Sequence, residues 1–289
     1  MATGDSTVLE SRTVFVVIQP VRVNRMNRNT NNKDFFIWYN GIMPFRYFNE
    51  EPILKPEHLF RKVDNWPETA IITWQSGFIR AAQNYNMKPL SIKAKSNSIL
   101  VSELTYKDKR YAFSKIGIGG PSTAPFMEEM AVFGTKNFIF IGSCGELTDN
   151  LKGKIIVPDR AYRDEGTSWH YIPDSEEYIE VQTAKHTETI VKNLGFDYEV
   201  GSVWTTDAVY RETPSAVEYY KEQGCIAVDM ECASIMAVAR CKKLDAYQIL
   251  FTADSLAGGS WKKGRLLHMA KTAWDAYLNL ALELADSIS

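Results

Sequence analysis

A length of 289 residues suits one large α/β domain or two ordinary ones, and it is enough to bury a sizeable core. Hydrophobic residues make up 45% of the chain and charged residues 24%, averages of globular proteins that exclude intrinsic disorder and fibrous classes. The formal net charge of −2 excludes a general attraction for nucleic acid or anionic membranes, so any phosphate binding must be local.

The first part of the chain is the least regular. Residues 1–13 are polar, residues 13–19 form a β-rich run, and residues 24–33 are rich in asparagine, which is typical of a turn or loop. From about residue 66, apolar strand candidates alternate with helical stretches, and no linker or internal repeat divides them. We therefore predict an irregular N-terminal extension, residues 1–65, packed on one domain, residues 66–289.

The alternation of apolar runs and helical periodicity predicts an α/β domain. The predicted strands are 70–74, 98–105, 110–116, 137–141, 154–157, 226–230 and 247–252. Several are continuous apolar runs, as expected of strands that are covered on both faces. The predicted helices are 78–85, 124–133, 183–193, 214–223, 231–243 and 266–287, and the apolar stripe of the last is interpreted as core packing.

A glycine-rich loop follows the strand predicted at 110–116. Its sequence is Gly117-Ile118-Gly119-Gly120-Pro121-Ser122, and a predicted helix comes next. Backbone amides at such a helix N-terminus can face an anion, and glycine permits close approach. Local sequence alone fits a tight βα turn equally well.

Two further strand ends carry polar side chains. Ser143 stands in Ile141-Gly142-Ser143-Cys144-Gly145, where it offers a hydroxyl between small neighbours or caps the next turn. Glu231 stands in Val228-Asp229-Met230-Glu231-Cys232, at a predicted strand-to-helix junction. Its carboxylate either grips the hydroxyls of a bound sugar or only favours the helix dipole.

The last strand candidate ends at Asp254, in Phe251-Thr252-Ala253-Asp254-Ser255-Leu256. A carboxyl in such a desolvated position has a raised pKa and can hold a proton near neutrality. The alternative is a turn or N-cap aspartate preceding Ser255.

These four motifs, in this order, resemble the nucleoside phosphorylase family, which contains hexameric purine nucleoside phosphorylases, uridine phosphorylases and methylthioadenosine nucleosidases. The resemblance covers roughly residues 70–287. It implies a single three-layer α/β domain around a central mixed, partly barrel-like sheet flanked by helices. It also implies a homo-oligomer, either a dimer or a hexamer built as a trimer of dimers, with sites completed by a neighbour.

The resemblance assigns roles to individual residues. Asp254 matches the catalytic acid at the base, and Glu231 with Met230 match the ribose-binding pair. Four residues are assigned to phosphate: Gly119, Gly120, Ser143 and, by a looser alignment, Arg80. One departure stands out, because Phe140 occupies the place of a phosphate-binding arginine and supplies no hydrogen-bond donor. Either phosphate is held by other groups, or water replaces it as nucleophile.

Two aromatic segments are expected to shape the base site, and both are interpreted as loops. They are residues 164–171 and 204–210, and the candidate base contacts are Trp169, His170, Tyr171, Thr206 and Val209. The first three residues fit ordinary packing as well. The chain lacks the inserted loop with which uridine phosphorylases read uracil, so the resemblance favours a purine.

The sequence therefore predicts a nucleoside phosphorylase that uses inorganic phosphate as co-substrate, with no cofactor and no metal. The rivals are a phosphate-independent nucleosidase, a uridine phosphorylase and a non-catalytic nucleoside-binding or storage protein. Partners other than small molecules and further copies of the chain are not expected, so neither nucleic acid nor a membrane is predicted to bind. Cys144, Cys225, Cys232 and Cys241 lack metal-ligand or disulfide spacing and favour a reducing, cytoplasmic location.

Overall fold

The computed structural model describes residues 34–37, 45–48, 50–94, 99–172, 176–264 and 269–288. The chain divides into two units, Met1–Lys33 and Asp34–Ser289, and every described residue belongs to the second. The β-rich run at 13–19 and the asparagine-rich segment at 24–33 lie outside the described residues. The domain boundary at residue 65 stays a prediction.

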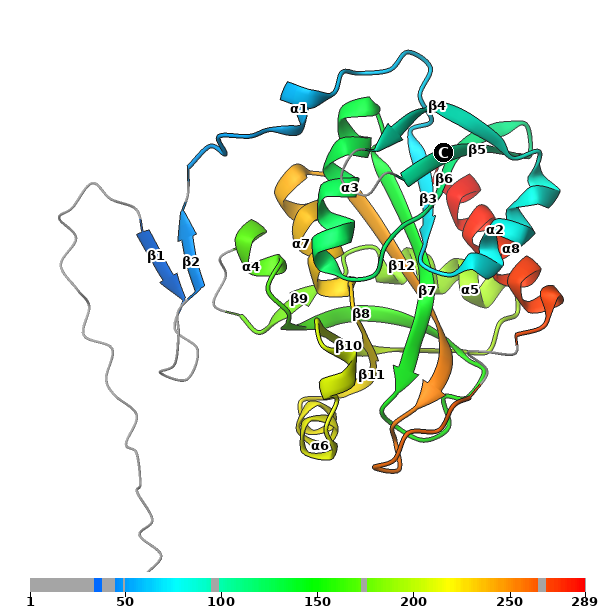
Figure 1. Ribbon diagram of the computed structural model, residues 1–289. Coiled ribbons are helices and arrows are strands. Elements are labelled where there is room, and N and C mark those ends of the chain that lie inside the picture. Colours follow the sequence, from blue (N-terminus) through cyan, green and yellow to red (C-terminus); the bar gives the residue numbers. More distant parts are fainter. Residues whose placement is uncertain are drawn as a thin grey trace, which may run out of the picture. The chain divides into compact units, whose positions relative to one another are not determined.

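A mixed sheet forms the centre of the second unit (Figure 1). Its strands follow the order β11-β10-β8-β12-β7-β3-β6-β5-β4, and β9 pairs with β8. A further pairing of β11 with β7 closes the five strands β7, β11, β10, β8 and β12 into a ring. The predicted mixed, partly barrel-like sheet is thus confirmed. The bounds are β3 (Thr69–Thr73), β4 (Lys88–Ala94), β5 (Ile99–Tyr106), β6 (Lys109–Lys115), β7 (Asn137–Glu146), β8 (Ile155–Asp164), β9 (Tyr178–Glu180), β10 (Tyr198–Thr206), β11 (Cys225–Asp229) and β12 (Asp245–Ser255).

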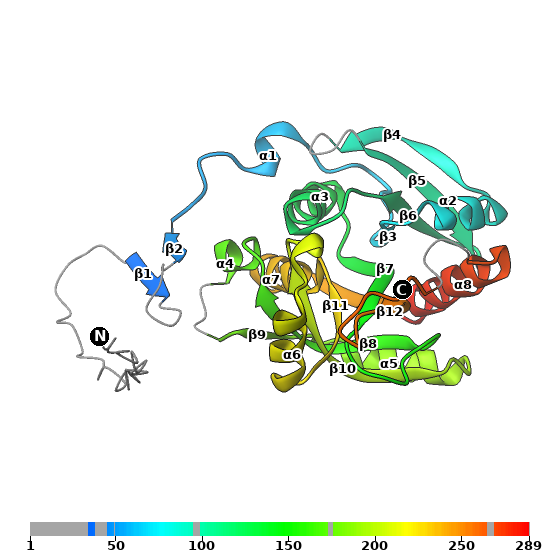
Figure 2. The same ribbon diagram turned by 60° about the horizontal axis from the view of Figure 1, so that its bottom comes forward.

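Helices cover the sheet on both faces and complete the predicted three layers (Figures 1 and 2). On one face α3 (Gly120–Phe133) packs against α7 (Cys232–Lys242). On the other, α2 (Ser76–Ala82) and α5 (Ala184–Asn193) pack against α8 (Lys271–Ser287). The shorter elements are β1 (Asp34–Ile37), which pairs with β2 (Phe45–Phe48), α1 (Pro56–Leu59), η1 (Gln83–Tyr85), α4 (Ser168–Tyr171), η2 (Val209–Arg211) and α6 (Pro214–Glu222).

The continuous apolar runs arise because central strands are buried on both faces. In β7, Phe138 and Phe140 belong to the core cluster under α3 and α7. Their neighbours Ile139 and Ile141 belong to the cluster under α2 and α8. Successive side chains of a strand point to opposite faces, so every residue of such a strand needs an apolar side chain.

Two parts of the ring differ from the sequence prediction. Strand β8 continues seven residues past Val157, where the predicted strand ended, and Pro158 lies within it. Pro158 pairs with Gly201 next to a shift in register, an irregularity at which a strand tolerates proline. The whole of β10 was missed, so the interpretation of residues 204–206 as a loop was wrong. Residues 168–171 likewise form a helical turn within the segment interpreted as a loop.

Candidate active site

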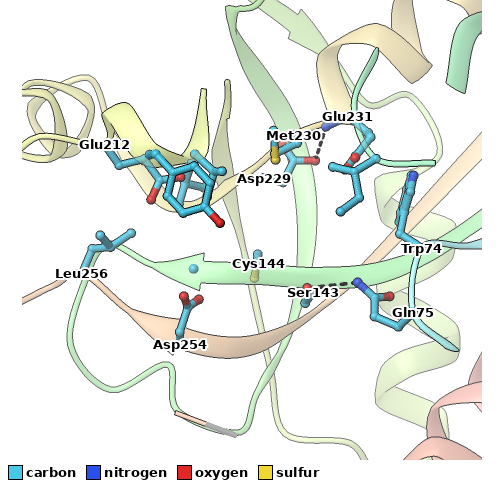
Figure 3. Close-up of a pocket in the computed structure, with 15 residues that line it drawn as sticks. Trp74, Gln75, Ser143, Cys144, Glu212, Asp229, Met230, Glu231, Asp254 and Leu256 are labelled. Atoms are coloured by element: carbon cyan, nitrogen blue, oxygen red, sulfur yellow. Dashed lines mark hydrogen bonds between the residues drawn. The ribbon is translucent and has the colours of Figure 1, made fainter. Parts of the chain in front are cut away.

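A pocket of about 420 Å³ opens where the sheet strands β3, β7, β11 and β12 end (Figure 3). This volume suits a small organic ligand. Each of the four sequence motifs contributes to its wall, so the predicted convergence of the motifs is found in the structure. The lining residues are Trp74, Gln75, Ile118, Ser143, Cys144, Gly145, Val209, Tyr210, Glu212, Val228, Asp229, Met230, Glu231, Asp254 and Leu256.

The pocket has two chemically different ends. In Figure 3, Glu212 and Asp254 lie toward one end, and Gln75 and Ser143 lie toward the other. Met230 lies between these two ends, and Glu231 lies across the pocket from Ser143 and Gln75. A ligand that spans the pocket would therefore meet the carboxyl groups of Glu212 and Asp254 at one end, and Glu231 together with neutral hydrogen-bonding groups at the other.

Asp254 belongs to strand β12 rather than to a turn or a helix cap. The register between β12 and β7 shifts between Thr252 and Asp254, and such a bulge re-aims the side chain that follows it. Burial raises the pKa of the Asp254 carboxyl, while a hydrogen bond from Trp261 acts in the opposite direction. In that bond the indole Nε1 donates to Oδ2 over 2.7 Å. The pKa of Asp254 is thus set by two opposing effects, burial and the hydrogen bond from Trp261.

Glu231 is buried, and its side chain does not cap α7, which begins at Cys232. Its Oε1 accepts a hydrogen bond from the backbone N–H of Gly119 over 2.6 Å. Burial, reinforced by the nearby charge of Asp229, raises the pKa of Glu231 to about 8. The Glu231 carboxyl is therefore bound to the glycine loop and lines the pocket, rather than capping α7.

Asp229, rather than Glu231, accepts hydrogen bonds from the backbone at the N-terminus of α7. Its Oδ2 accepts from the backbone N–H of Cys232 over 2.8 Å, and its Oδ1 accepts from the hydroxyl of Thr205 over 2.7 Å. Burial raises the pKa of Asp229 to about 6 against the effect of these bonds. Because both oxygens are occupied, Asp229 fixes the start of α7 and thereby positions Glu231.

The glycine loop, residues 117–122, contacts the site through a hydrogen bond to Glu231. Gly119 adopts φ +94°, a conformation that favours glycine, and its N–H is directed at Glu231. A Cβ on Gly120 would come within 2.2 Å of the Ser234 hydroxyl oxygen, so α3 can approach α7 only with glycine there. Neither glycine lines the pocket, and Ile118 alone represents the loop in its wall. The amide of Gly119 therefore serves Glu231 in this chain.

The end of the pocket near Ser143 is neutral. Ser143 lies within β7, so it caps no turn, and its Oγ accepts from Nε2 of Gln75 over 3.1 Å. Behind them the ring of Trp74 stacks on Phe140, with centroids 5.8 Å apart, and a Cβ on Gly142 would meet the Trp74 ring at 2.6 Å. No lysine, arginine or histidine is found among the described residues that line the pocket. An anion bound here would be held by neutral donors alone.

Several predicted site residues lie elsewhere. Arg80 is exposed on α2 and lines a separate cavity with Lys271 and Trp274. Trp169 is buried beneath the Arg163 guanidinium, 3.8 Å from its carbon to the ring centroid. The remaining three are His170, which is exposed, Tyr171, which donates to Glu128, and Thr206, whose hydroxyl accepts from the Ala208 N–H. Of the predicted base contacts, only Val209 lines the pocket.

Sequence reasoning missed several residues at the site. Gln75 and Glu212 line the pocket, and Trp261 binds Asp254 from the loop that follows β12. Glu212 stands just before Thr213 and Pro214, and this sequence indicates the start of a helix. An acidic residue at such a position is commonly exposed to solvent, so nothing in the sequence placed Glu212 in a pocket. The nearby Val209 and Tyr210 could have indicated this position, because apolar residues next to a polar group are typical of the wall of a ligand pocket.

Two absences bear on the kind of site. Within the described residues, no group of three or more histidine, cysteine, aspartate or glutamate side chains is arranged to hold a metal ion. In the same part of the chain, no helix is both long and apolar enough to cross a membrane. The four cysteines are free thiols, and Cys144 lies in the pocket wall, where burial raises its pKa.

Comparisons with known proteins agree with this geometry. Residues 78–281, well over half of the chain, match the family described as the phosphorylase superfamily. A DeoD-type purine nucleoside phosphorylase of Caldanaerobacter subterraneus is 29% identical over 188 residues, which is 62% of this chain and 78% of the relative. A guanosine phosphorylase of Halorubrum lacusprofundi is 27% identical over 212 residues, which is 72% of this chain and 87% of the relative.

Solved structures share the fold. The purine nucleoside phosphorylase of Toxoplasma gondii superposes with a TM-score of 0.67 at 20% identity, covering 78% of this chain and 92% of that one. The uridine phosphorylase of Vibrio fischeri superposes with a TM-score of 0.66 at 22% identity, covering 82% and 98%. The arrangement of the closed ring of strands and its flanking helices is thus shared with both proteins.

Proposed function

The chain belongs to the phosphorylase superfamily, and we propose that it cleaves the N-glycosidic bond of a purine nucleoside by reversible phosphorolysis, giving free base and pentose 1-phosphate. The observation that carries the proposal is the placement of Asp254, Glu231 and Ser143, from three separate strand ends, in the wall of one pocket. The relatives named purine nucleoside phosphorylase and guanosine phosphorylase support it.

The base end supplies the acid. A purine is a poor leaving group until a proton or a hydrogen bond reaches N7. Burial raises the pKa of Asp254, so the carboxyl keeps its proton at a higher pH than an exposed aspartate does. In the proposed reaction this proton moves to N7 while the bond between the base and the anomeric carbon breaks.

The middle of the pocket holds the pentose. The Glu231 carboxyl, largely protonated at neutral pH because its pKa is raised to about 8, hydrogen-bonds the sugar hydroxyls, and Met230 packs on the sugar face. The hydrogen bond from Gly119 keeps the carboxyl in place before the substrate arrives. Such preorganisation matters because the sugar becomes oxocarbenium-like, and groups already in place need not rearrange in the transition state.

The neutral end receives the nucleophile. Inorganic phosphate, the proposed co-substrate in a reaction without other cofactors, would accept hydrogen bonds from the Ser143 hydroxyl and the Gln75 amide. A second candidate function is hydrolysis, in which water attacks the anomeric carbon. It is favoured by the lack of a cation among the described residues of the pocket wall and by Phe140 beneath Trp74.

Base release in the presence and absence of inorganic phosphate separates the two reactions. Phosphorolysis predicts that release of the base from purine nucleosides depends on phosphate and that pentose 1-phosphate accumulates in equal amount. Chromatography of both products measures this. Unchanged turnover in phosphate-free buffer, with free pentose as the second product, would assign the protein to the hydrolases instead.

We also propose that the protein works as a cytoplasmic homo-oligomer, either a dimer or a hexamer built as a trimer of dimers. Apolar side chains at the pocket support this proposal, because Ile118 is 65% exposed and Tyr210 is 98% exposed. A second copy covering them could also bring a cation to the neutral end. Free cysteines are consistent with a reducing compartment.

A further inference from the structure

Glu165 is a buried acid that lies outside the pocket wall. It directly follows the last residue of β8. The backbone N–H of Thr167 donates to its Oε2 over 2.6 Å, and that of Ser168 is shared between Oε1 and Oε2, at 3.1 and 3.0 Å. These bonds close the turn into α4, and a purely local role for Glu165 requires no other contact.

A further hydrogen bond joins Glu165 to a helix that is distant in the sequence. The hydroxyl of Ser234, in the first turn of α7, donates to the same Oε2 over 2.7 Å. Both side chains are buried, and neither lines the pocket. A buried polar network whose members are all hydrogen-bonded is rigid. The start of α7 is therefore fixed to the end of β8 by a contact that the turn itself does not need.

The glycine loop packs directly against this contact. A Cβ on Gly120 would lie 2.2 Å from the hydroxyl oxygen of Ser234 and 2.8 Å from that of Thr167. Both of these residues donate to Glu165, Ser234 through its hydroxyl and Thr167 through its backbone N–H. The surface that Gly120 contacts is thus held in place by one carboxyl.

The residue before Gly120 holds Glu231. The N–H of Gly119 donates to Oε1 of Glu231 over 2.6 Å. Consecutive residues of a chain move together, so a shift of Gly120 displaces this N–H, and hydrogen bonds weaken steeply when their geometry is lost. A continuous series of contacts therefore runs from Glu165 through Ser234 and the glycine loop to the carboxyl of Glu231.

We propose that Glu165 is a positioning residue for the sugar site, which acts through Ser234 and the glycine loop to hold Glu231 in place for the hydroxyls of the pentose. Glu165 itself does not touch the substrate. This inference rests on the proposed cleavage of nucleosides, in which Glu231 binds the sugar. It extends that proposal by naming the group that sets the orientation of Glu231 and, with it, the preference for ribose over 2′-deoxyribose.

The test compares inosine with 2′-deoxyinosine as substrates of the full chain. Ser234→Ala removes the hydrogen bond to Glu165 and leaves the backbone bonds of Glu165 intact. In S234A, kcat/KM should fall by about 10-fold for inosine and by about 2-fold for 2′-deoxyinosine, because only inosine presents both hydroxyls to Glu231. The ratio of the two values should therefore fall by about 5-fold. KM for phosphate should stay unchanged, since the groups at the neutral end are not part of this series of contacts.

Ser202→Ala is the matched control. Ser202 is a buried serine of β10 that accepts a hydrogen bond from Arg160 and donates one to Asp159, and it does not line the pocket. S202A thus also removes a buried hydroxyl that bonds charged side chains. It should leave the ratio of inosine to 2′-deoxyinosine as in the wild type. Thermal unfolding of both variants shows whether the two substitutions cost comparable stability.

A double-mutant cycle tests whether Glu165 acts through Ser234. In Glu165→Gln the amide nitrogen faces a donor in either orientation, because both oxygens of Glu165 accept hydrogen bonds. E165Q should therefore lower the ratio as S234A does. Combining the two should lower it little further, since residues that act through one contact are not additive. A wild-type ratio in E165Q, or fully additive effects, would overturn the inference.

The outcomes separate this inference from the proposed function. If the wild type cleaves nucleosides but does not favour inosine, or if S234A slows both substrates equally, the inference is overturned and the proposed function stands. If the wild type releases no base from any nucleoside, the proposed function fails. Calorimetric binding of inosine and 2′-deoxyinosine to the wild type and S234A then decides the inference. S234A should lose affinity mainly for inosine, and an equal loss for both nucleosides, or none, would overturn it.

Discussion

The two ends of the pocket differ in the chemistry of their side chains. At the base end, the partly buried carboxyls of Glu212 and Asp254 both have raised pKa values, chiefly because of burial. At the other end, Ser143 and Gln75 are hydrogen-bonded to each other, and the adjacent Trp74 stacks on Phe140. Glu212, with a pKa of about 7, can exchange a proton with a ligand near neutral pH, whereas Ser143 and Gln75 can only offer hydrogen bonds.

This difference ranks the expected effects of substitution. A neutral hydrogen bond contributes about 1 kcal/mol net, so the loss of one donor is a modest change. A positioned acid that protonates the leaving group contributes about 10²- to 10⁴-fold to the rate. Substitutions at the base end should therefore reduce catalysis strongly, and substitutions at the neutral end should mainly weaken binding.

The largest effect is expected for Asp254→Asn. The amide keeps the size of the side chain but carries no transferable proton, so kcat for base release from a purine nucleoside should fall by about 10³-fold. Asp245→Asn is the matched control, because Asp245 is exposed at the start of the same strand. Base release by both variants, followed by chromatography, measures the difference.

Two results would contradict this assignment of Asp254. Activity of D254N within about threefold of the wild type would remove the proposed acid, since general acid catalysis normally contributes far more. Equal and negligible base release by the wild type and D254N would instead favour a nucleoside-binding protein without catalytic activity.

A smaller effect is expected at the neutral end. Ser143→Ala removes one donor to the nucleophile, so KM for phosphate should rise by about 5- to 10-fold with little change in kcat. Ser215→Ala, at an exposed position of α6, is the matched control. A loss of kcat of more than about 100-fold in S143A would contradict the role of Ser143 as a neutral donor and would indicate that it takes part in the chemical step.

Much of the fold was predictable because the central strands are buried on both faces. Residues 138–141 are apolar at every position, and this run predicted β7. Strand β10 escaped prediction because its sequence includes Gly201 and Ser202 and because its apolar residues do not alternate. The second half of β8 was not predicted because proline within a run argues against a strand. Pro158 is tolerated there because it lies next to the register shift in the pairing of β8 with β10.

Some residues of the site could likewise be predicted from local sequence, whereas others are placed by tertiary contacts. Asp254, Glu231 and Ser143 follow apolar runs of sequence, so their place near strand ends at the sheet edge could be predicted from local sequence. The positions of Trp169 and Glu212 could not. Trp169 is buried by its contact with Arg163, a contact between β8 and α4, and Glu212 reaches the pocket because of the turns that precede α6. Aromatic residues beside polar ones predicted a base contact in both segments, and tertiary packing decided which segment lines the pocket.

The smallest effect is expected from the residue that tunes the base end, Trp261. Its indole N–H donates to Asp254 and stabilises the ionised carboxylate, so Trp261→Phe should raise the pKa of Asp254 further. A general acid works in its protonated form, and kcat/KM therefore falls as pH rises through its pKa. In W261F this alkaline limb should move to higher pH, with a gain of a few-fold in rate above it. The pH profile for adenosine measures the shift, and W261F made in the E212Q background is the control, because Glu212 lies at the same end of the pocket and also has a raised pKa. A limb that stays in place, or that moves to lower pH, would show that the carboxyl held by Trp261 does not donate the proton, and the chemical difference between the two ends would then rest on Glu212 alone.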